Sequence, residues 1–434
     1  MLVVRQRWPR PGALDVEARV RELLRAPQLA HRLDQLRSQC AGPPRIAVTA
    51  GSRGITDLVP VLRTVVAGLR DHGCAPFIAP CMGSHGGATA RGQLEVLRSL
   101  GVSERSVGAS IVSSLDVVQV ATSGYGAPVY VGRDLVEADG VLVVNRIKPH
   151  TDFCGEIGSG IVKMLAVGMG KQHGAEVAHR LSLRHGFAQA LEELAGLVLA
   201  RLPVLGAIGI VEDQRDHTAA IELLDTSRGI GGLLPREIEL ERVADGLLPR
   251  LPFDHLDVLI VDHIGKEVSG AGMDPNVIGR RASVLFPQPE RPRILRIYVR
   301  GLTAASHGNA LGIGMADFVH RRLLDGVDRA ATEINCIASS APEDGRIPIA
   351  LPNDREAVAA CLDTCGVLSA VEARVAWIRD TAHLEWLAVS STLAAEVTAA
   401  GECLEIVGAP FALEFDESGD LSSPWGGTNV DTPA

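Results

Sequence analysis

Lys163 has the side-chain type and the setting that nucleophilic or covalent chemistry requires. It is the only charged residue in the apolar run IVKMLAVGMG, which belongs to a longer segment, 155–179, that contains six glycines. An amine in apolar surroundings loses its proton more readily and becomes a nucleophile. The alternative is a lysine stem that lies on a sheet with its amine in water, and the run by itself leaves both interpretations open.

Three loops upstream of this lysine mix glycine with groups suited to anion binding or proton transfer. Their sequences are AGSRGITD at 50–57, CMGSHGGAT at 81–89 and NRIKPHTDF at 145–153. Each follows a short apolar segment, and in open parallel sheets ligands bind outside the carboxyl ends of the strands. We therefore expect the three loops to converge, although a glycine after a strand is also an ordinary turn requirement.

The elements that must position these groups alternate between apolar strand-like runs and amphipathic helix-like stretches. The expected strands cover 45–51, 76–80, 139–146, 206–213, 257–262, 293–300, 385–390 and 404–415. The expected helices cover 57–70, 89–100, 309–325 and 353–365. Continuously apolar strands between helices are typical of parallel sheets covered on both faces.

The sequence therefore predicts an α/β protein of two lobes, each a mainly parallel sheet flanked by helices, with the active site in the cleft between them. A chain of 434 residues exceeds one ordinary domain. The proline-spaced connection at 246–257 predicts an N-terminal cofactor-binding and catalytic domain at 1–250 and a C-terminal substrate-closing domain at 251–434. The polar tail after Asp416 is expected to be loosely ordered.

The composition argues against several classes of protein. A formal net charge of −10 gives no reason to bind nucleic acid or an anionic membrane. The sequence has neither a signal peptide at its start nor an apolar stretch long enough to span a bilayer, so we expect a cytoplasmic protein. The eight cysteines form no paired CxxC framework and are expected to be reduced. Cys361 and Cys365 suit helix packing as well as metal.

The order of the motifs resembles one enzyme family. GSRGITD, MGSHGG and KPH, followed by a lysine and a histidine 16 positions later, are similar to the lactate racemases that use a nickel-pincer nucleotide. The resemblance covers roughly residues 45–180 and extends more loosely beyond them. Its most specific part runs from His150 to His179.

The resemblance implies a role for each matching residue. Lys163 matches the lysine that joins the cofactor through a thioamide, and His179 matches the nickel ligand. His85 and His150 match the two general acid–base histidines, and Arg53 matches an arginine at the substrate site. The implied cofactors are nickel and its carrier, a pyridinium-3,5-bisthiocarboxylic acid mononucleotide.

The residue types agree with these roles. Arg53 offers a planar fork for a carboxylate, while Ser52, Gly51 and the loop that contains Gly83 could bind the nucleotide phosphate. Three donors from the pincer leave one position of a square plane, and one imidazole is enough to fill it. His173 lies nearer to Lys163 in sequence and is the alternative ligand, but the 16-residue interval favours His179.

The implied reaction explains the need for two histidines. The α-hydrogen of a 2-hydroxy acid is barely acidic beside its carboxylate, whereas its removal as hydride needs an electron-poor carbon, which a metallated pyridinium provides. A histidine can take the hydroxyl proton as hydride leaves and return it later. Because the ketone can accept hydride on either face, one histidine is expected on each side of the substrate.

The sequence departs from the family in both lobes. Its first loop has Ala50 and Gly51 where the family usually has an Asp-His pair, and the interval from His150 to Lys163 is longer than in lactate-specific members. Their Tyr-Gln…Lys group is missing from the second lobe. Instead, the glycine-rich loop 262–281 offers Lys266 as a substrate-binding residue, with Ser269 and Asn276 for polar contacts or turn formation.

A second polar block, 303–318, places His307, Asn309 and Asp317 at the start of an expected helix. Its N-terminus could face an anionic substrate, but capping by Ser306 or Asn309 is an equal alternative.

These features predict a racemase or epimerase of a 2-hydroxy acid other than lactate. Its expected partners are that small-molecule substrate and cofactor-biosynthesis proteins, with no nucleic acid and no membrane. Two alternatives stay open: a nickel-nucleotide carrier without catalysis, and a nicotinamide-dependent oxidoreductase. The second should show GxGxxG after its first strand, and AGSRGI does not match that pattern.

Overall fold

A computed structural model of the chain describes residues 1–9, 12, 14–52, 54–150, 155–283 and 287–425. It divides into two compact units: Pro11–Leu248, called the N-terminal unit, and Pro249–Ala434 with Met1–Arg10, called the C-terminal unit. The sequence places the first residues in the N-terminal domain, and the structure corrects this. They belong to the C-terminal unit because β1 (Leu2–Gln6) pairs there with two strands.

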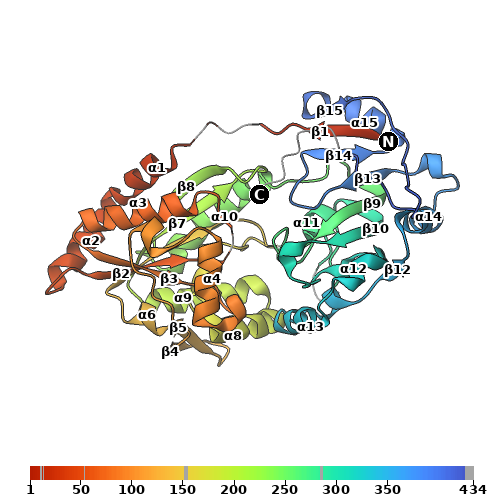
Figure 1. Cartoon of the computed structure of the whole chain (residues 1–434). Helices are drawn as coiled ribbons and strands as arrows, with labels where there is room; N and C mark the ends of the chain where they lie inside the picture. The colour runs from red at the N-terminus through yellow and green to blue at the C-terminus, as the bar shows by residue number, and fades with distance from the viewer. Residues whose placement is uncertain (10–11, 13, 53, 151–154, 284–286, 426–434) are drawn as a thin grey trace. The chain divides into compact units, whose positions relative to one another are not determined.

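A five-stranded sheet forms the middle of the N-terminal unit (Figure 1). In spatial order its strands are β3 (Ala75–Pro80), β2 (Arg45–Ala50), β6 (Gly140–Arg146), β7 (Val204–Glu212) and β8 (Thr218–Leu224). The first four run parallel, and β8 is antiparallel to β7. β6 shows why these strands are continuously apolar: Val141 and Val143 join the core on one face, whereas Leu142 and Val144 join the core on the other.

Helices cover both faces of this sheet. One face packs against α1 (Val16–Leu24), α2 (Pro27–Gln39), α3 (Leu58–Asp71), α4 (Ala90–Ser99) and α5 (Glu104–Val107). The other packs against α6 (Arg133–Val136), α7 (Ile161–Lys163), the π-helix η2 (Met164–Gly168), α8 (Lys171–His185), α9 (Phe187–Arg201) and α10 (Ile230–Gly246). The 3₁₀ turn η1 (Gly86–Ala88) and the hairpin β4 (Val117–Thr122) and β5 (Pro128–Gly132) complete the unit.

The C-terminal unit contains an eight-stranded sheet. Its order is β12 (Ile349–Leu351), β11 (Phe318–His320), β10 (Arg293–Leu302), β9 (His255–Ile264), β13 (Val375–Ile378), β14 (Trp386–Val389), β1 and β15 (Leu404–Val407). The first five strands are parallel, and the last three extend the sheet in antiparallel fashion. Its helices are α11 (Pro275–Ile278), α12 (Arg321–Asp325), α13 (Arg329–Ala338), α14 (Asp354–Thr364) and α15 (Ala394–Ala399). The predicted α/β class, with mainly parallel sheets flanked by helices, is therefore confirmed.

The stretch 309–325, expected to be one helix, consists of short elements. The 3₁₀ turn η4 (Ile313–Met315) and strand β11 precede α12. A helix does not continue through Gly312, because its φ is +92°; the position requires glycine, since a Cβ there would lie 1.8 Å from the carbonyl oxygen of Ala271. The chain instead becomes extended and pairs with β10.

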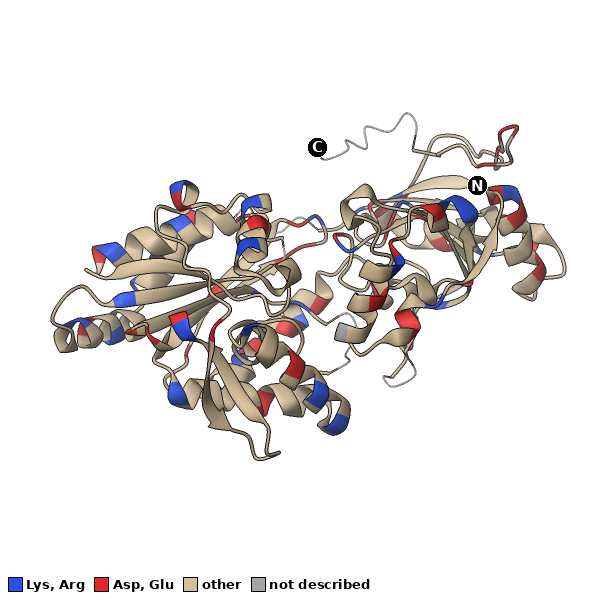
Figure 2. Ribbon diagram, turned by 60° about the horizontal axis from the view of Figure 1, so that its bottom comes forward, with Lys and Arg blue, Asp and Glu red and all other residues tan. Residues whose placement is uncertain are grey.

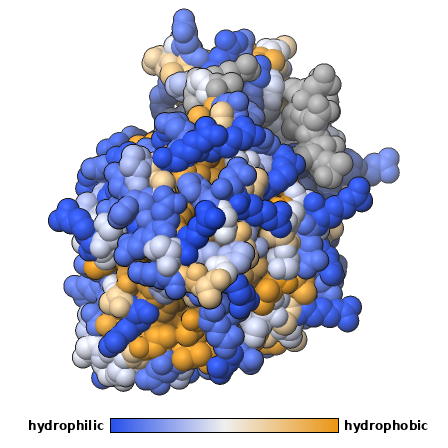
Figure 3. All heavy atoms as spheres, turned by 90° about the vertical axis from the view of Figure 1, so that its left-hand side faces the viewer, coloured by the Kyte–Doolittle hydropathy of each residue, from blue (hydrophilic) through white to orange (hydrophobic). Residues whose placement is uncertain are grey.

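Basic and acidic residues are both distributed along the chain of each unit (Figure 2). The face drawn in Figure 3 is mostly hydrophilic, with apolar residues gathered in its lower part. Among the described residues, no helix has the length and apolar character needed to cross a membrane.

Candidate active site

The three glycine-containing loops leave the N-terminal sheet at one edge, because they follow the adjacent parallel strands β2, β3 and β6. The first loop approaches the segment that carries Lys163. A Cβ on Gly51 would lie 3.3 Å from Asn145 Oδ1 and 3.4 Å from Met164 Cε. The first loop, the third loop and the start of the π-helix are thus in contact.

The second loop lies against α8. Gly83 has a φ of +58°, and a Cβ there would lie 3.4 Å from Ala175 Cβ. Ala175 and His179 are four residues apart on α8 and therefore share a face of the helix. The loop that carries His85 accordingly packs beside the helix face that carries His179. Both histidine side chains are half-buried.

Lys163 meets one of the predicted histidines. Its Nζ lies 2.6 Å from His150 Nε2, and the His150 ring packs against Phe187 with centroids 4.8 Å apart. An ammonium group can only donate a hydrogen bond, so Nε2 must carry the lone pair when Lys163 is protonated. The contact therefore pairs a primary amine with a proton acceptor.

Two buried glutamates on α10, not among the residues predicted from the sequence, lie against the turn that precedes this lysine. Glu237 is 0% exposed and accepts the backbone N–H groups of Val162 and Ile161; Glu241 is 6% exposed and accepts that of Gly158. Burial raises the pKa of each carboxyl to about 8, and the charge of Glu237 adds to the effect on Glu241. Both carboxyls are thus bound to the turn that precedes Lys163.

These pKa shifts predict that stability falls as pH rises. A carboxyl whose pKa is higher in the folded chain binds more protons when folded, so its contribution is complete below about pH 4.5 and is lost as pH rises through about 8. Each group can change the free energy of unfolding by up to about 1.4 kcal/mol per pH unit in that window. The double variant Glu237→Gln/Glu241→Gln should show a flatter pH dependence.

Hydrogen-exchange protection factors of the β6 amides, measured across this range, report the N-terminal unit. Glu239→Gln is the matched control, because Glu239 lies exposed on the same helix and pairs with Arg236. If stability depended equally steeply on pH in the wild type and the double variant, Glu237 and Glu241 would not be the groups responsible.

Lysine itself is rare in this chain. Only four occur among 42 lysine and arginine residues, and they are Lys148, Lys163, Lys171 and Lys266. The other basic residues of this kind are arginines, whose guanidinium group keeps its proton and is not a nucleophile. All four lysines lie in the predicted site segments, so their scarcity is a signal that could have identified Lys148 and Lys171 from the sequence.

Lys171 has a structural position that arginine could not occupy. It is fully buried, and its Nζ donates to the Pro80 carbonyl at 2.7 Å and pairs with Asp134 at 3.3 Å. A Cβ on Gly132 would lie 2.5 Å from Lys171 Cε, so the neighbouring backbone is closely packed around the stem. Lys171 thereby joins the end of β3 to the start of α8.

The remaining N-terminal candidates are placed as follows. Ser52 is half-buried next to Gly51, and Arg53 lies outside the described residues. His173 is exposed on α8, and its ring stands edge-on to Tyr130 with centroids 5.6 Å apart.

Lys266, the predicted substrate-binding residue of the second lobe, follows β9 in the C-terminal unit. Its Nζ donates to Asn335 Oδ1 on α13, and its backbone N–H donates to Ser306 Oγ at 3.1 Å. These bonds fix the loop to α13 and to the polar block 303–318.

The polar block itself has local structural roles. With no long helix beginning there, Asn309 Oδ1 accepts the N–H of Leu311 at 3.1 Å, in an Asx-type turn. Asp317 pairs with Arg280 at 2.7 Å and accepts the N–H of Ile297 at 2.8 Å. Both alternatives left open for this block, a helix N-terminus that faces substrate and a cap on that helix, required a long helix that the structure does not have there.

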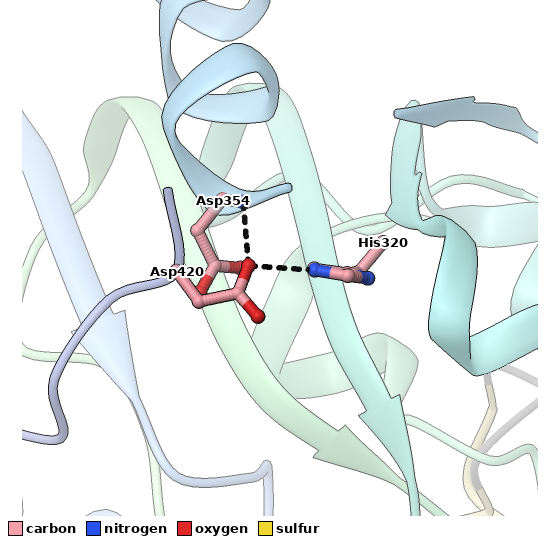
Figure 4. Close-up of side chains that lie close together, drawn as sticks. All are labelled: His320, Asp354 and Asp420. Atoms are coloured by element: carbon pink, nitrogen blue, oxygen red, sulfur yellow. Dashed lines mark hydrogen bonds and ion pairs between the residues drawn. The ribbon is translucent and has the colours of Figure 1, made fainter. Parts of the chain in front are cut away.

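His320, Asp354 and Asp420 form a group whose ligand atoms could surround a metal ion (Figure 4). Each side chain already has protein partners. His320 Nδ1 accepts the N–H of Arg322 at 3.0 Å, so its Nε2 carries the proton and donates to Asp420 Oδ1 at 2.9 Å. Asp354 is bound by Arg300. The arrangement is complete as a hydrogen-bonded charge network without an ion.

Comparison with known proteins identifies a matching family model and a solved structure of similar fold. A family model described as a domain of unknown function, DUF362, matches residues 48–226, a range that contains His85, His150, Lys163 and His179. Among solved structures, the lactate racemase apoprotein from Thermoanaerobacterium thermosaccharolyticum is similar, with a TM-score of 0.53, 11% identity, and coverage of 85% of this chain and 91% of that one. Comparison with curated proteins found no match. The chain thus has a lactate racemase-like fold.

Proposed function

We propose that this protein is a racemase or epimerase of a 2-hydroxy acid that works with a covalently attached nickel-pincer nucleotide. The observation that carries the proposal is the 2.6 Å contact between Lys163 Nζ and His150 Nε2. It pairs an amine suited to attachment with a proton acceptor at the carboxyl edge of a parallel sheet, where ligands bind. The lactate racemase-like fold supports the class of reaction.

The donor set fits such a cofactor. Lys163 is half-buried beside the first loop, where Gly51 and Ser52 offer a backbone N–H and a hydroxyl to a phosphate. An imidazole suits nickel, and His179 lies on the helix face against which the second loop packs.

Each residue then has a separate task. When bound, the cofactor supplies an electron-poor carbon that can accept hydride from C2 of the substrate. Lys163 attaches the cofactor and His179 binds its nickel. His85 and His150 move the hydroxyl proton, while Arg53 neutralises the substrate carboxylate. Loading requires cofactor-biosynthesis proteins.

Lys163→Ala should abolish the covalent mass increment, whereas His179→Ala should keep the increment and lose nickel. The reason is that attachment and metal binding depend on different side chains. Protein co-produced with the cofactor-making enzymes is analysed by intact mass and metal content. His173→Ala, on the same helix but exposed, is the control and should behave like the wild type.

Retention of both mass and nickel in the two variants would overturn the assignment. The same preparation, tested on both enantiomers of a panel of 2-hydroxy acids, separates an isomerase from a carrier, because a carrier would be loaded but inactive.

A further inference from the structure

Helix α7 begins without a cap of its own. Its N-cap residue is Gly160, which has no side chain to accept the first N–H groups of the helix. Glu237 on α10 supplies the acceptors instead: its carboxylate lies 3.0 and 3.2 Å from the N–H of Val162 and also accepts that of Ile161. Glu241, one turn further along α10, accepts the N–H of Gly158.

The glycines of this turn are matched to the two carboxylates. A Cβ on Gly158 would lie 2.6 Å from both carboxylate oxygens of Glu241, and a Cβ on Gly160 would lie 2.2 Å from Glu237 Oε1. A side chain at either position would displace the carboxylate that binds the turn. Two of the six glycines around Lys163 are thereby explained.

The turn is also fixed from its other side. Asn145 Nδ2 donates to the carbonyl of Gly160 at 2.8 Å, and the backbone of Ser159 pairs with that of Lys148 at 2.7 and 3.1 Å. Lys163 follows at once, as the last residue of a three-residue helix, and a π-helix begins directly after it. The turn therefore determines the direction in which the Lys163 side chain leaves the backbone.

Capping by two buried acids is a costly way to stabilise a helix end. A serine or asparagine at the N-cap would satisfy an N–H group without burying a carboxyl. Here two carboxyls lie four residues apart on one helix, and Glu241 Oε1 has no hydrogen-bond partner among the described residues. Ionisable groups perturbed by burial cluster at functional sites.

We propose that Glu237 and Glu241 are positioning residues that clamp the turn 158–162 and thereby direct the Lys163 amine at His150. The inference rests on the proposed role of Lys163, but its test uses protein without cofactor. Failure of the clamp and failure of the nickel chemistry can therefore be told apart.

The chain's four lysines make amine labelling a clean readout. Ligand-free, full-length protein is treated with trace acetic anhydride at a series of pH values, and the acetylation of Lys163 is followed by peptide mass spectrometry. We expect the pH profile of Glu237→Ala to depart from that of the wild type and to coincide with that of His150→Ala, because both lose the contact. Glu237→Gln keeps an acceptor oxygen and should restore the wild-type profile, as should the exposed control Glu239→Gln.

A wild-type profile in Glu237→Ala would overturn the inference, and so would a Glu237→Gln profile as altered as that of the alanine variant. An unchanged profile in His150→Ala would overturn it as well, since the contact would then not govern the amine. Below pH 8, where the Glu237 carboxyl is neutral, amide exchange at Val162 should accelerate by up to about tenfold in Glu237→Ala, the factor that corresponds to one neutral hydrogen bond.

A second pair of variants tests the clamp even if Glu237→Ala folds poorly. Gly160 has a φ of −142°, which alanine can adopt, so Gly160→Ala is opposed by the Glu237 carboxylate and not by the backbone. The double variant Gly160→Ala/Glu237→Ala should therefore lose less free energy of unfolding than the sum of the losses in the two single variants. The inference would be overturned if the losses of stability were additive and the changes in the pH profile of Lys163 acetylation were additive as well.

Discussion

His150→Ala and His85→Ala should each lower the rate of interconversion by about 10²–10⁴-fold, the range typical of general acid–base catalysis. Inversion needs a proton acceptor for each enantiomer, and the two histidines come from different loops, after β6 and after β3. Initial rates from both enantiomers, measured on cofactor-loaded protein by chiral chromatography, test this. His31→Ala, exposed on α2, is the control.

The result must hold in both directions, because the intermediate is common to the two. A variant that is inactive from one enantiomer but fully active from the other would contradict the two-histidine scheme. His150→Ala carries a further consequence that His85→Ala does not: it removes the partner of Lys163. Intact mass should therefore be recorded for both variants, so that loss of catalysis is separated from loss of attachment.

An isotope label distinguishes hydride transfer from proton abstraction. Deuterium at C2 of the substrate should remain at C2 of the product if it moves as hydride, since hydride does not exchange with water. Complete washout of the label during turnover would rule out the proposed mechanism.

The sheets were predictable because burial on both faces leaves a direct trace in the sequence. The run GVLVV becomes β6 because Val141 and Leu142 face opposite cores, and both cores require apolar residues. The loops at the carboxyl edge were predictable for a related reason: parallel strands that alternate with helices bring their ends together. The contact of Lys163 with His150 is a finding of the structure that the convergence of the loops does not by itself predict.

Long-range pairing could not be predicted. β1 is a short alternating strand at the chain start, and nothing local shows that its partners are β14 and β15, near the other end of the chain. The stretch 309–325 has the apolar spacing of a helix, but Gly312 has a φ of +92° and its N–H donates to the carbonyl of Asp344. In both cases a tertiary contact overrides a local pattern.

Glu237 and Glu241 escaped prediction because acidic residues four apart on an amphipathic helix normally form a solvated face. Only the fold shows that a remote turn supplies their N–H partners. Gly158 and Gly160 are two of the six glycines in 155–179, yet a glycine in a sequence gives no sign of which group approaches it.

The polar tail after Asp416, expected to be loosely ordered, is anchored as far as the structure describes it. Leu421 is buried, its N–H donates to Asp354 at 2.7 Å, and Trp425 Nε1 donates to Asp262 Oδ2 at 2.9 Å. The tail is polar because it closes a buried charge network, where its backbone and side chains serve as hydrogen-bond partners.

Asp354→Ala should destabilise the C-terminal unit by about 3–5 kcal/mol, because it leaves one charge of a buried pair without its partner. Asp354 is 0% exposed and binds Arg300, which is 8% exposed, and it also accepts from the Tyr298 hydroxyl and the Leu421 N–H. All four tryptophans, Trp8, Trp377, Trp386 and Trp425, lie in this unit, so urea unfolding followed by tryptophan fluorescence reports it alone.

Asp254→Ala is the matched control for this change, since Asp254 pairs with Arg291 at the surface, where both side chains are about 70% exposed, and such a pair contributes about 1 kcal/mol or less. A loss in Asp354→Ala no larger than that of the control would show that the network is not a stabilising one. If the wild-type preparation instead contained one metal ion per chain and Asp354→Ala contained none, the group would have to be reassigned as a metal centre formed by His320, Asp354 and Asp420. The completed hydrogen bonds of His320 and Asp354 lead us to expect destabilisation without metal release.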